Sequence, residues 1–305
     1  MDFEVIENHY KAIAEGNLTS EQIKQIYHEI KENTTFKKLV PSKKLENVET
    51  IGFLNPLKIG DYLHIFGTSR DDNKGKVFKC DKDLNIVSEM NLPEVVITST
   101  STDGVDAFVY DGQGKRLLKL KESGVEVAVD LSDSGKEILS LQTDGKFVYA
   151  NIGNLHHDKY DLEGKLVQEK AFPSEGLVLA NGFVYNSHGN DIEKYDAETG
   201  EFIWKEFVAF EDRPIIDGEK IYFNDVHGKV ACYLEKDDKL ELVGVYLCKS
   251  GILDLVDGDD FYTNKSSGFF EEEDLCCFYK NQKVKHNEVS SGFLEQLVKR
   301  VLEEE

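Results

Sequence analysis

A tight turn followed by a run of aromatic and β-branched residues recurs six times along this chain of 305 residues. Successive turns are separated by about 36 to 43 residues, and each precedes a run such as FVYA from Phe147 or IYFN from Ile221. Asp-Gly and Asn-Gly suit the positive backbone angles of two-residue hairpin turns, so each repeat is predicted to begin as a β-hairpin. The turns are Gly60-Asp61, Asp103-Gly104, Asp144-Gly145, Asn181-Gly182, Asp217-Gly218 and Asp257-Gly258.

Two further strands complete each repeat. A third strand follows about eleven residues later, as in RLLKLK from Arg116, and a fourth comes after another polar turn, as in EFIWKEF from Glu201. Four antiparallel strands in about 40 residues describe one blade of a β-propeller, whose radial stacking protects most sheet edges. The sequence therefore predicts an all-β fold, a six-bladed β-propeller of four-stranded antiparallel blades over residues 45–290, with short N- and C-terminal helices.

The number of blades depends on one more segment. ENVETIGFLN from Glu46 reads as a strand that pairs with the last blade near KVKHNEV and closes the ring by joining the two chain ends. If this segment instead builds a separate sheet with the C-terminal strand, the propeller has seven blades.

The repeat in residues 183–204, FVYNSHGNDIEKYDAETGEFIW, is the clearest of the six. It resembles the repeat of the quinoprotein-like (PQQ-like) β-propeller family, in which a strand ending in Asp, a Thr-Gly turn and a Trp follow in order. The matching positions here are Asp196, Thr199, Gly200 and Trp204. We expect Asp196 to accept hydrogen bonds from turn amides, Gly200 to adopt the left-handed conformation, and Trp204 to fill the space between neighbouring sheets.

The cofactor-using members of that family are exported dehydrogenases that hold a quinone and a calcium ion and carry a disulfide between adjacent cysteines. The adjacent pair Cys276-Cys277 falls in the predicted strand LCCFY, where neighbouring side chains point to opposite faces. The N-terminus MDFEVIENHY also lacks the pattern of an export signal. We therefore predict a packing role for the two cysteines and no bound cofactor.

Both chain ends follow a helical period. In residues 1–35, a helical hairpin is predicted whose second helix begins with a capping box, Thr19 and Gln22. Residues 291–305 are predicted to form an amphipathic helix with Leu297 and Val301 on its apolar stripe. Short helices of this kind must bury their apolar faces, so they either cap the propeller or dock a partner.

The charge balance limits the choice of partners. Lys and Arg number 36 against 58 Asp and Glu, a formal net charge of -22, which opposes binding to nucleic acid or to an anionic membrane. The acidic run Glu271, Glu272, Glu273 and Asp274 is a candidate surface for a basic protein partner. The five cysteines are an odd number scattered along the chain, which favours reduced thiols and a cytoplasmic location.

The sequence gives little support for a catalytic or metal-binding site. His156, His157, His188 and His227 do not form a metal-ligand pattern, and Asp81, Asp83 and Asn85 lack the glycine and the bidentate glutamate of a calcium loop. No phosphate loop, nucleophile elbow or metalloprotease histidine pair is present. The favoured function is a non-enzymatic protein-protein interaction scaffold that uses an acidic propeller and flanking helices. The alternative is a hydrolase, lyase or sugar-binding propeller with its site in the central channel.

Overall fold

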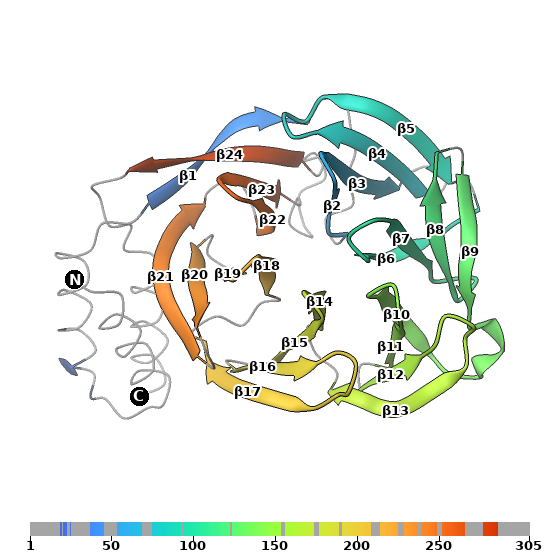
Figure 1. The fold of residues 1–305 in the computed structure, drawn as a ribbon. Helices are drawn as coiled ribbons and strands as arrows, with labels where there is room; N and C mark the ends of the chain where they lie inside the picture. Colours follow the sequence, from blue (N-terminus) through green and yellow to red (C-terminus); the bar gives the residue numbers. More distant parts are fainter. Residues whose placement is uncertain are drawn as a thin grey trace.

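The protein, here a computed structural model, is a six-bladed β-propeller whose blades surround a common axis (Figure 1). Four sheets have four strands each, and a fifth sheet of eight strands consists of two such blades joined at their outer edges. The structure describes residues 19, 21–22, 25, 37–45, 54–68, 75–92, 94–122, 124–153, 156–173, 177–188, 191–208, 214–224, 229–236, 239–248, 252–265 and 277–285.

Every blade is antiparallel, and its first strand lies nearest the axis (Figure 1). Blades 1 to 3 consist of β2 (Leu57–Ile59), β3 (Tyr62–Thr68), β4 (Gly75–Asp81) and β5 (Ile86–Leu92); β6 (Ile97–Thr102), β7 (Ala107–Asp111), β8 (Arg116–Lys121) and β9 (Gly124–Asp130); and β10 (Ile138–Thr143), β11 (Val148–Ile152), β12 (His156–Tyr160) and β13 (Leu166–Pro173). A short 3-10 helix, η1 (Ser132–Ser134), connects blades 2 and 3.

Blades 4 to 6 repeat this order, except that the last blade takes its outer strand from the start of the chain. They consist of β14 (Val178–Ala180), β15 (Phe183–His188), β16 (Asp191–Asp196) and β17 (Phe202–Phe207); β18 (Ile215–Asp217), β19 (Lys220–Asn224), β20 (Lys229–Lys236) and β21 (Lys239–Cys248); and β22 (Ile252–Asp257), β23 (Asp260–Lys265), β24 (Cys277–Lys285) and β1 (Lys37–Lys44).

The six predicted turns connect the first and second strand of each blade. In blade 4, the turn residues Asn181 and Gly182 have φ angles of 55° and 81°, so both positions are left-handed. Asn tolerates this region better than most residues and Gly carries no Cβ to clash. The recurring dipeptides are therefore the corners of equivalent sheets, and the predicted six-bladed count is confirmed.

Ring closure joins the two ends of the propeller, as predicted, but with an earlier segment. Strand β1 pairs antiparallel with β24, from Lys37 opposite Lys285 to Lys44 opposite Tyr279. Its first residues also pair in parallel with the end of β21, which links blades 5 and 6. Residue Asn55, in the segment expected to close the ring, lies in a loop, and residues 46–53 fall outside the described part of the chain.

The core lies between blades rather than along the axis. Apolar side chains from the facing sheets of neighbouring blades form separate clusters: one joins blades 1 and 2 around Phe66 and Val109, and another joins blades 5 and 6 around Tyr222 and Phe261. Most of these side chains are fully buried. Each blade is therefore stabilised by its two neighbours, as in other radial repeat folds.

At the N-terminus, the described residues include the predicted capping box. The Thr19 amide donates to Gln22 Oε1 at 2.9 Å, and the Gln22 amide donates to Thr19 Oγ1 at 3.3 Å. The rest of the predicted N-terminal hairpin and all of the predicted helix in residues 291–305 lie outside the described residues. Within the described part of the chain, no helix has the length and hydrophobicity to cross a membrane.

Candidate functional site

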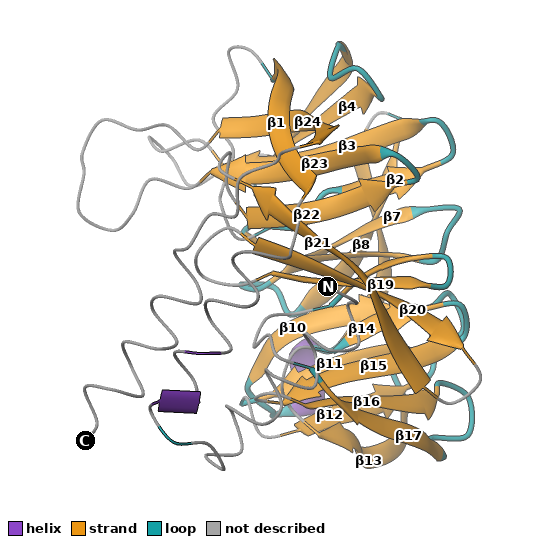
Figure 2. Ribbon diagram, turned by 90° about the vertical axis from the view of Figure 1, so that its left-hand side faces the viewer, coloured by secondary structure: helices purple, strands orange, loops and turns teal. Residues whose placement is uncertain are grey.

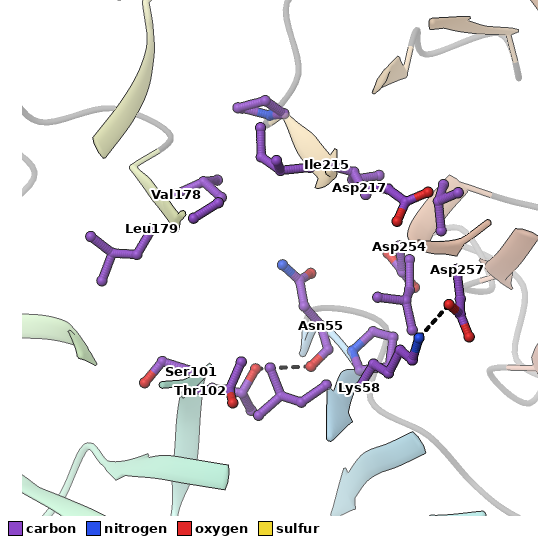
Figure 3. Close-up of a pocket in the computed structure, with 18 of the residues that line it drawn as sticks. Asn55, Lys58, Ser101, Thr102, Val178, Leu179, Ile215, Asp217, Asp254 and Asp257 are labelled. Carbon is purple, nitrogen blue, oxygen red and sulfur yellow. Dashed lines mark hydrogen bonds and ion pairs between the residues drawn. The ribbon is translucent and has the colours of Figure 1, made fainter. Parts of the chain in front are cut away.

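The central axis holds a cavity of about 290 Å³ that is lined by the first strands of all six blades. Figure 3 shows Val178 and Leu179 on one side of it, facing the carboxylates of Asp217, Asp254 and Asp257 on the other. Neither His nor Arg is among its described lining residues. The cavity thus combines an apolar wall with an acidic wall, and lacks the set of histidines or arginines that would suggest an axial active site.

Several polar side chains around this cavity connect neighbouring blades. The hydroxyl of Thr100 donates to the carbonyl of Asn55 at 2.9 Å, and Gln142 Nε2 donates to the carbonyl of Leu177 at 3.2 Å. Lys58 forms an ion pair with Asp257 across blades 1 and 6 (Figure 3). The buried Oγ of Ser101, which also lines the cavity, has no hydrogen-bond partner among the described residues.

The clearest repeat places Asp196 at the end of β16, Thr199 and Gly200 in the turn that follows, and Trp204 in β17. Oδ1 of Asp196 accepts the amides of Glu198 at 3.0 Å and Thr199 at 2.7 Å, and the Thr199 hydroxyl at 3.0 Å. These donors stabilise the carboxylate and lower the pKa of Asp196, with the Thr199 amide the largest cause. Gly200 has a φ of 76°, and its amide donates to the Asp196 carbonyl at 2.9 Å.

Trp204 lies at the junction of blades 4 and 5. Its side chain is 5% exposed and packs edge-on against Tyr185 of the same blade. Its indole Nε1 donates to Glu235 of blade 5 at 3.2 Å. Glu235 also accepts the Tyr185 hydroxyl at 2.9 Å and the Lys194 ammonium at 2.5 Å. The sequence motif therefore surrounds a structural junction: its residues lie far from the axial cavity.

The other singled-out side chains form ordinary structural contacts. Asp81 Oδ1 accepts the amides of Asp83 and Asn85 at 2.9 Å each, which describes a turn. His156 and His157 begin β12, where Nε2 of His156 lies 3.2 Å from Asp158 and Nδ1 of His157 lies 3.1 Å from the Pro173 carbonyl. No cluster of three or more metal-binding side chains occurs among the residues that the structure describes.

The candidate partner-binding residues are not placed by the structure. Glu271–Asp274, Leu297 and Val301 lie outside the described ranges, as do His227 and Cys276. Cys80, Cys232 and Cys248 are buried, and none of the three forms a disulfide within the described part of the chain. Burial raises the pKa of Cys80 to about 11, so that thiol is protonated and unreactive at neutral pH.

The described turns on one side of the propeller contain more carboxylates than lysines. Because the strands alternate in direction, the turn after the first strand and the turn after the third strand of each blade lie on the same side of the ring. These loops run along the right-hand edge of Figure 2, and we call this side the turn face. Its described turn residues include three lysines, Lys82, Lys146 and Lys165, against twelve carboxylates: Asp61, Asp83, Asp103, Asp106, Glu122, Asp144, Asp161, Glu163, Glu198, Glu201, Glu219 and Asp259.

Comparison with known proteins supports the fold and nothing finer. No family model and no curated protein matches the chain. Among solved structures, a chain of a mitotic checkpoint complex has a TM-score of 0.50 and 9% identity over 82% of this chain and 93% of that chain. BamB from Moraxella catarrhalis (11% identity, 80% and 99% covered) and glutaminyl cyclase from Myxococcus xanthus (10%, 84% and 100%) each have a TM-score of 0.45. At 9% identity, the likeness to the checkpoint-complex chain shows a similar fold alone.

Proposed function

We propose that this protein is a non-enzymatic scaffold that binds a basic protein partner on its turn face. The observation that carries the proposal is the excess of carboxylates over lysines in the turns of that face. Such a surface attracts a basic protein at long range and repels nucleic acid. The axial cavity supports the same proposal, because Thr100, Gln142 and Lys58 in its lining connect neighbouring blades.

The proposal includes two finer points. The Asp196, Thr199, Gly200 and Trp204 arrangement supports descent from quinoprotein-like propellers in which the repeat is kept as a structural unit. The buried cysteines, reduced at Cys80, Cys232 and Cys248, support a reducing compartment, the cytoplasm. We further propose that Glu271–Asp274 and the Leu297 and Val301 stripe add to the partner surface.

The experiment compares two triple variants of the full chain as baits for capture from the source cell at low and high salt. The first, Glu163→Gln with Glu201→Gln and Glu219→Gln, removes three carboxylates from exposed turn-face positions in blades 3 to 5. The second, Glu126→Gln with Glu169→Gln and Glu241→Gln, removes three exposed carboxylates from outer strands of three blades and is the matched control.

We expect the wild type and the control to retain a stoichiometric basic protein at low salt, and the turn-face variant to lose most of it. High salt should release it from all three baits, because exposed charges are screened. Equal recovery with both variants would contradict the turn face as the site, and recovery of no stoichiometric partner would contradict the scaffold function.

A further inference from the structure

Three blade junctions are closed by the same pair of side chains. A tyrosine on the second strand of the blade lies directly opposite a lysine on the third strand. The pairs are Tyr149 and Lys159 in blade 3, Tyr185 and Lys194 in blade 4, and Tyr262 and Lys280 in blade 6. We call each such pair, with its acceptor in the next blade, an interblade latch.

Each latch ends on oxygen atoms of the following blade. Lys159 donates to the carbonyls of Ala197 and Glu198 at 2.8 and 2.6 Å. Lys194 donates to the carboxylate of Glu235 at 2.5 Å. Lys280 donates to the carboxylate of Asp83 at 2.9 Å, beside Tyr262, whose hydroxyl donates to the carbonyl of Lys82 at 2.9 Å. The lysine ammonium of each latch therefore has a hydrogen-bond acceptor in the next blade, and in two of the three latches that acceptor is a carboxylate.

Blade 1 keeps the lysine of the latch and loses the tyrosine. Lys79 lies opposite His64, the third residue of β3, just as Lys194 lies opposite Tyr185, the third residue of β15. The Lys79 ammonium lies 4.1 Å from the centre of the Tyr62 ring, and that of Lys194 lies 3.8 Å from the Phe183 ring. The contact between the lysine and an aromatic ring of its own blade is thus preserved. The side chain that would reach blade 2, however, is the shorter His64 in place of a tyrosine.

Beside the apolar cluster that joins blades 1 and 2, part of this junction is open. A cleft of about 850 Å³ separates blade 1 from the turn of blade 2 that contains Glu122. Among the described residues, Lys79 forms no ion pair, and the buried Nδ1 of His64 has no hydrogen-bond partner. Burial, with the nearby Lys79 charge, lowers the pKa of His64, so its ring is neutral at neutral pH.

The rest of the cleft suits a compact apolar group. Val77, Met90, Ala107 and Leu120 contribute to its walls, and Val77 and Ala107 are buried. Of the three carboxylates that line the cleft, Glu89 pairs with Lys76 and Asp106 with Lys119, whereas Glu122 is exposed in the turn of blade 2. The second lining lysine, Lys121, pairs with Glu126. The combination of apolar walls with a single available cation is typical of a small-molecule pocket.

We propose that the cleft between blades 1 and 2 binds a small carboxylic acid with an apolar tail. Its carboxylate takes the place on Lys79 that Glu235 and Asp83 occupy on the lysines of closed junctions. Its tail lies against Val77, Met90 and Leu120, and fills the space that a tyrosine occupies elsewhere. This site is independent of the turn-face carboxylates removed above, so either proposal can fail without the other.

The test uses octanoate and 4-phenylbutanoate as probes, with octanamide and 4-phenylbutanamide as neutral controls of the same shape. Binding to the full-length protein is measured by ligand-observed NMR and calorimetry. We expect at least one acid to bind about tenfold more tightly than its amide, because a hydrogen bond between two charged groups is stronger than one to a neutral carbonyl. Lys79→Gln should remove that preference and leave the amide affinity unchanged.

Two further variants keep the outcome interpretable. His64→Tyr restores the side chain of the closed junctions, so it should abolish binding of acid and amide alike. Lys205→Gln removes a lysine from blade 4, away from the cleft, and should change nothing. Equal affinities for acid and amide, an unchanged acid affinity in Lys79→Gln, or binding of neither acid at millimolar concentration would each overturn the proposal.

Discussion

The junction between blades 4 and 5 and the junction between blades 1 and 2 have the same strand geometry and opposite outcomes. In the first, Tyr185, Lys194 and Trp204 converge on Glu235. In the second, His64 and Lys79 occupy the same strand positions, and a cleft remains beside the apolar cluster that joins the two sheets. Strand pairing within a blade therefore does not determine whether two blades close on each other. At these two junctions the difference lies in the length of one side chain and in one acceptor in the next blade.

The largest expected effect comes from breaking the closed junction. Glu235→Ala should lower the free energy of unfolding by about 4 kcal/mol, because it leaves the Lys194 ammonium, 7% exposed, without its carboxylate. Urea denaturation followed by circular dichroism measures the loss. Glu241→Ala, which removes an exposed partner of Lys236, should cost no more than about 1 kcal/mol. A similar loss of unfolding free energy in both variants would contradict a larger contribution of the latch than of an exposed ion pair.

The junction between blades 5 and 6 offers a closure of another kind. Asn224 donates to the carbonyl of Leu253 at 2.8 Å and accepts its amide at 3.0 Å. Asn224→Ala should cost about 2 kcal/mol, because it leaves two buried backbone groups unpaired. The matched control is Asn186→Ala in blade 4, whose buried amide has no hydrogen-bond partner among the described residues. That change should cost less than about 1 kcal/mol, and the reverse order in urea unfolding would contradict this account.

A third change converts the open junction toward the closed form. His64→Tyr should raise the free energy of unfolding by about 1 kcal/mol, through added apolar burial in the cleft and a hydroxyl close to blade 2. Thermal unfolding measures this gain. His64→Phe adds the ring without the hydroxyl and separates the two contributions. Loss of stability in both variants would mean that the cleft cannot accept a ring at this position.

The smallest effect is a pH dependence that only the open junction should show. Burial, and next the charge of Lys79, hold the pKa of His64 below its ordinary value of 6.5. The unfolded chain therefore binds a proton more readily than the folded one as the pH falls below 6.5. The contribution of His64 to stability is complete above that pH and is lost as the pH falls toward the folded-state pKa. Urea midpoints between about pH 7.5 and pH 5 should fall less steeply in His64→Phe.

The repeats were visible in the sequence because their turns need residues that tolerate positive φ angles, as Asn181 and Gly182 do. The strand that closes the ring was not visible. Residues 37–44, KKLVPSKK, contain four lysines and a proline, so they lack the alternation that marks a half-buried strand, although Leu39 is fully buried. The pattern instead favours the more apolar segment ENVETIGFLN, from Glu46, as the strand that closes the ring.

The interblade latches and the cleft between blades 1 and 2 cannot be predicted from the sequence alone. Lys194 and Glu235 are 41 residues apart, and neither residue type predicts burial. The cleft results from a His at the position where three other blades have a Tyr, and that difference gains meaning only when the registers of β3 and β15 are known. Local patterns predict turns and strands, whereas contacts between repeats depend on how the repeats stack.

The sixth blade can be completed only after both β1 and β24 have been synthesised. Strand β1 leaves the ribosome early, yet its partner β24 is made much later: Ser42 and Lys280, hydrogen-bonded through the Ser42 hydroxyl, are 238 residues apart. At about 5 to 20 residues per second, the first strand waits on the order of 10 to 50 s for its partner. During that time its unpaired edge is open to other chains, and the lysines and proline of KKLVPSKK are residues that discourage such contacts.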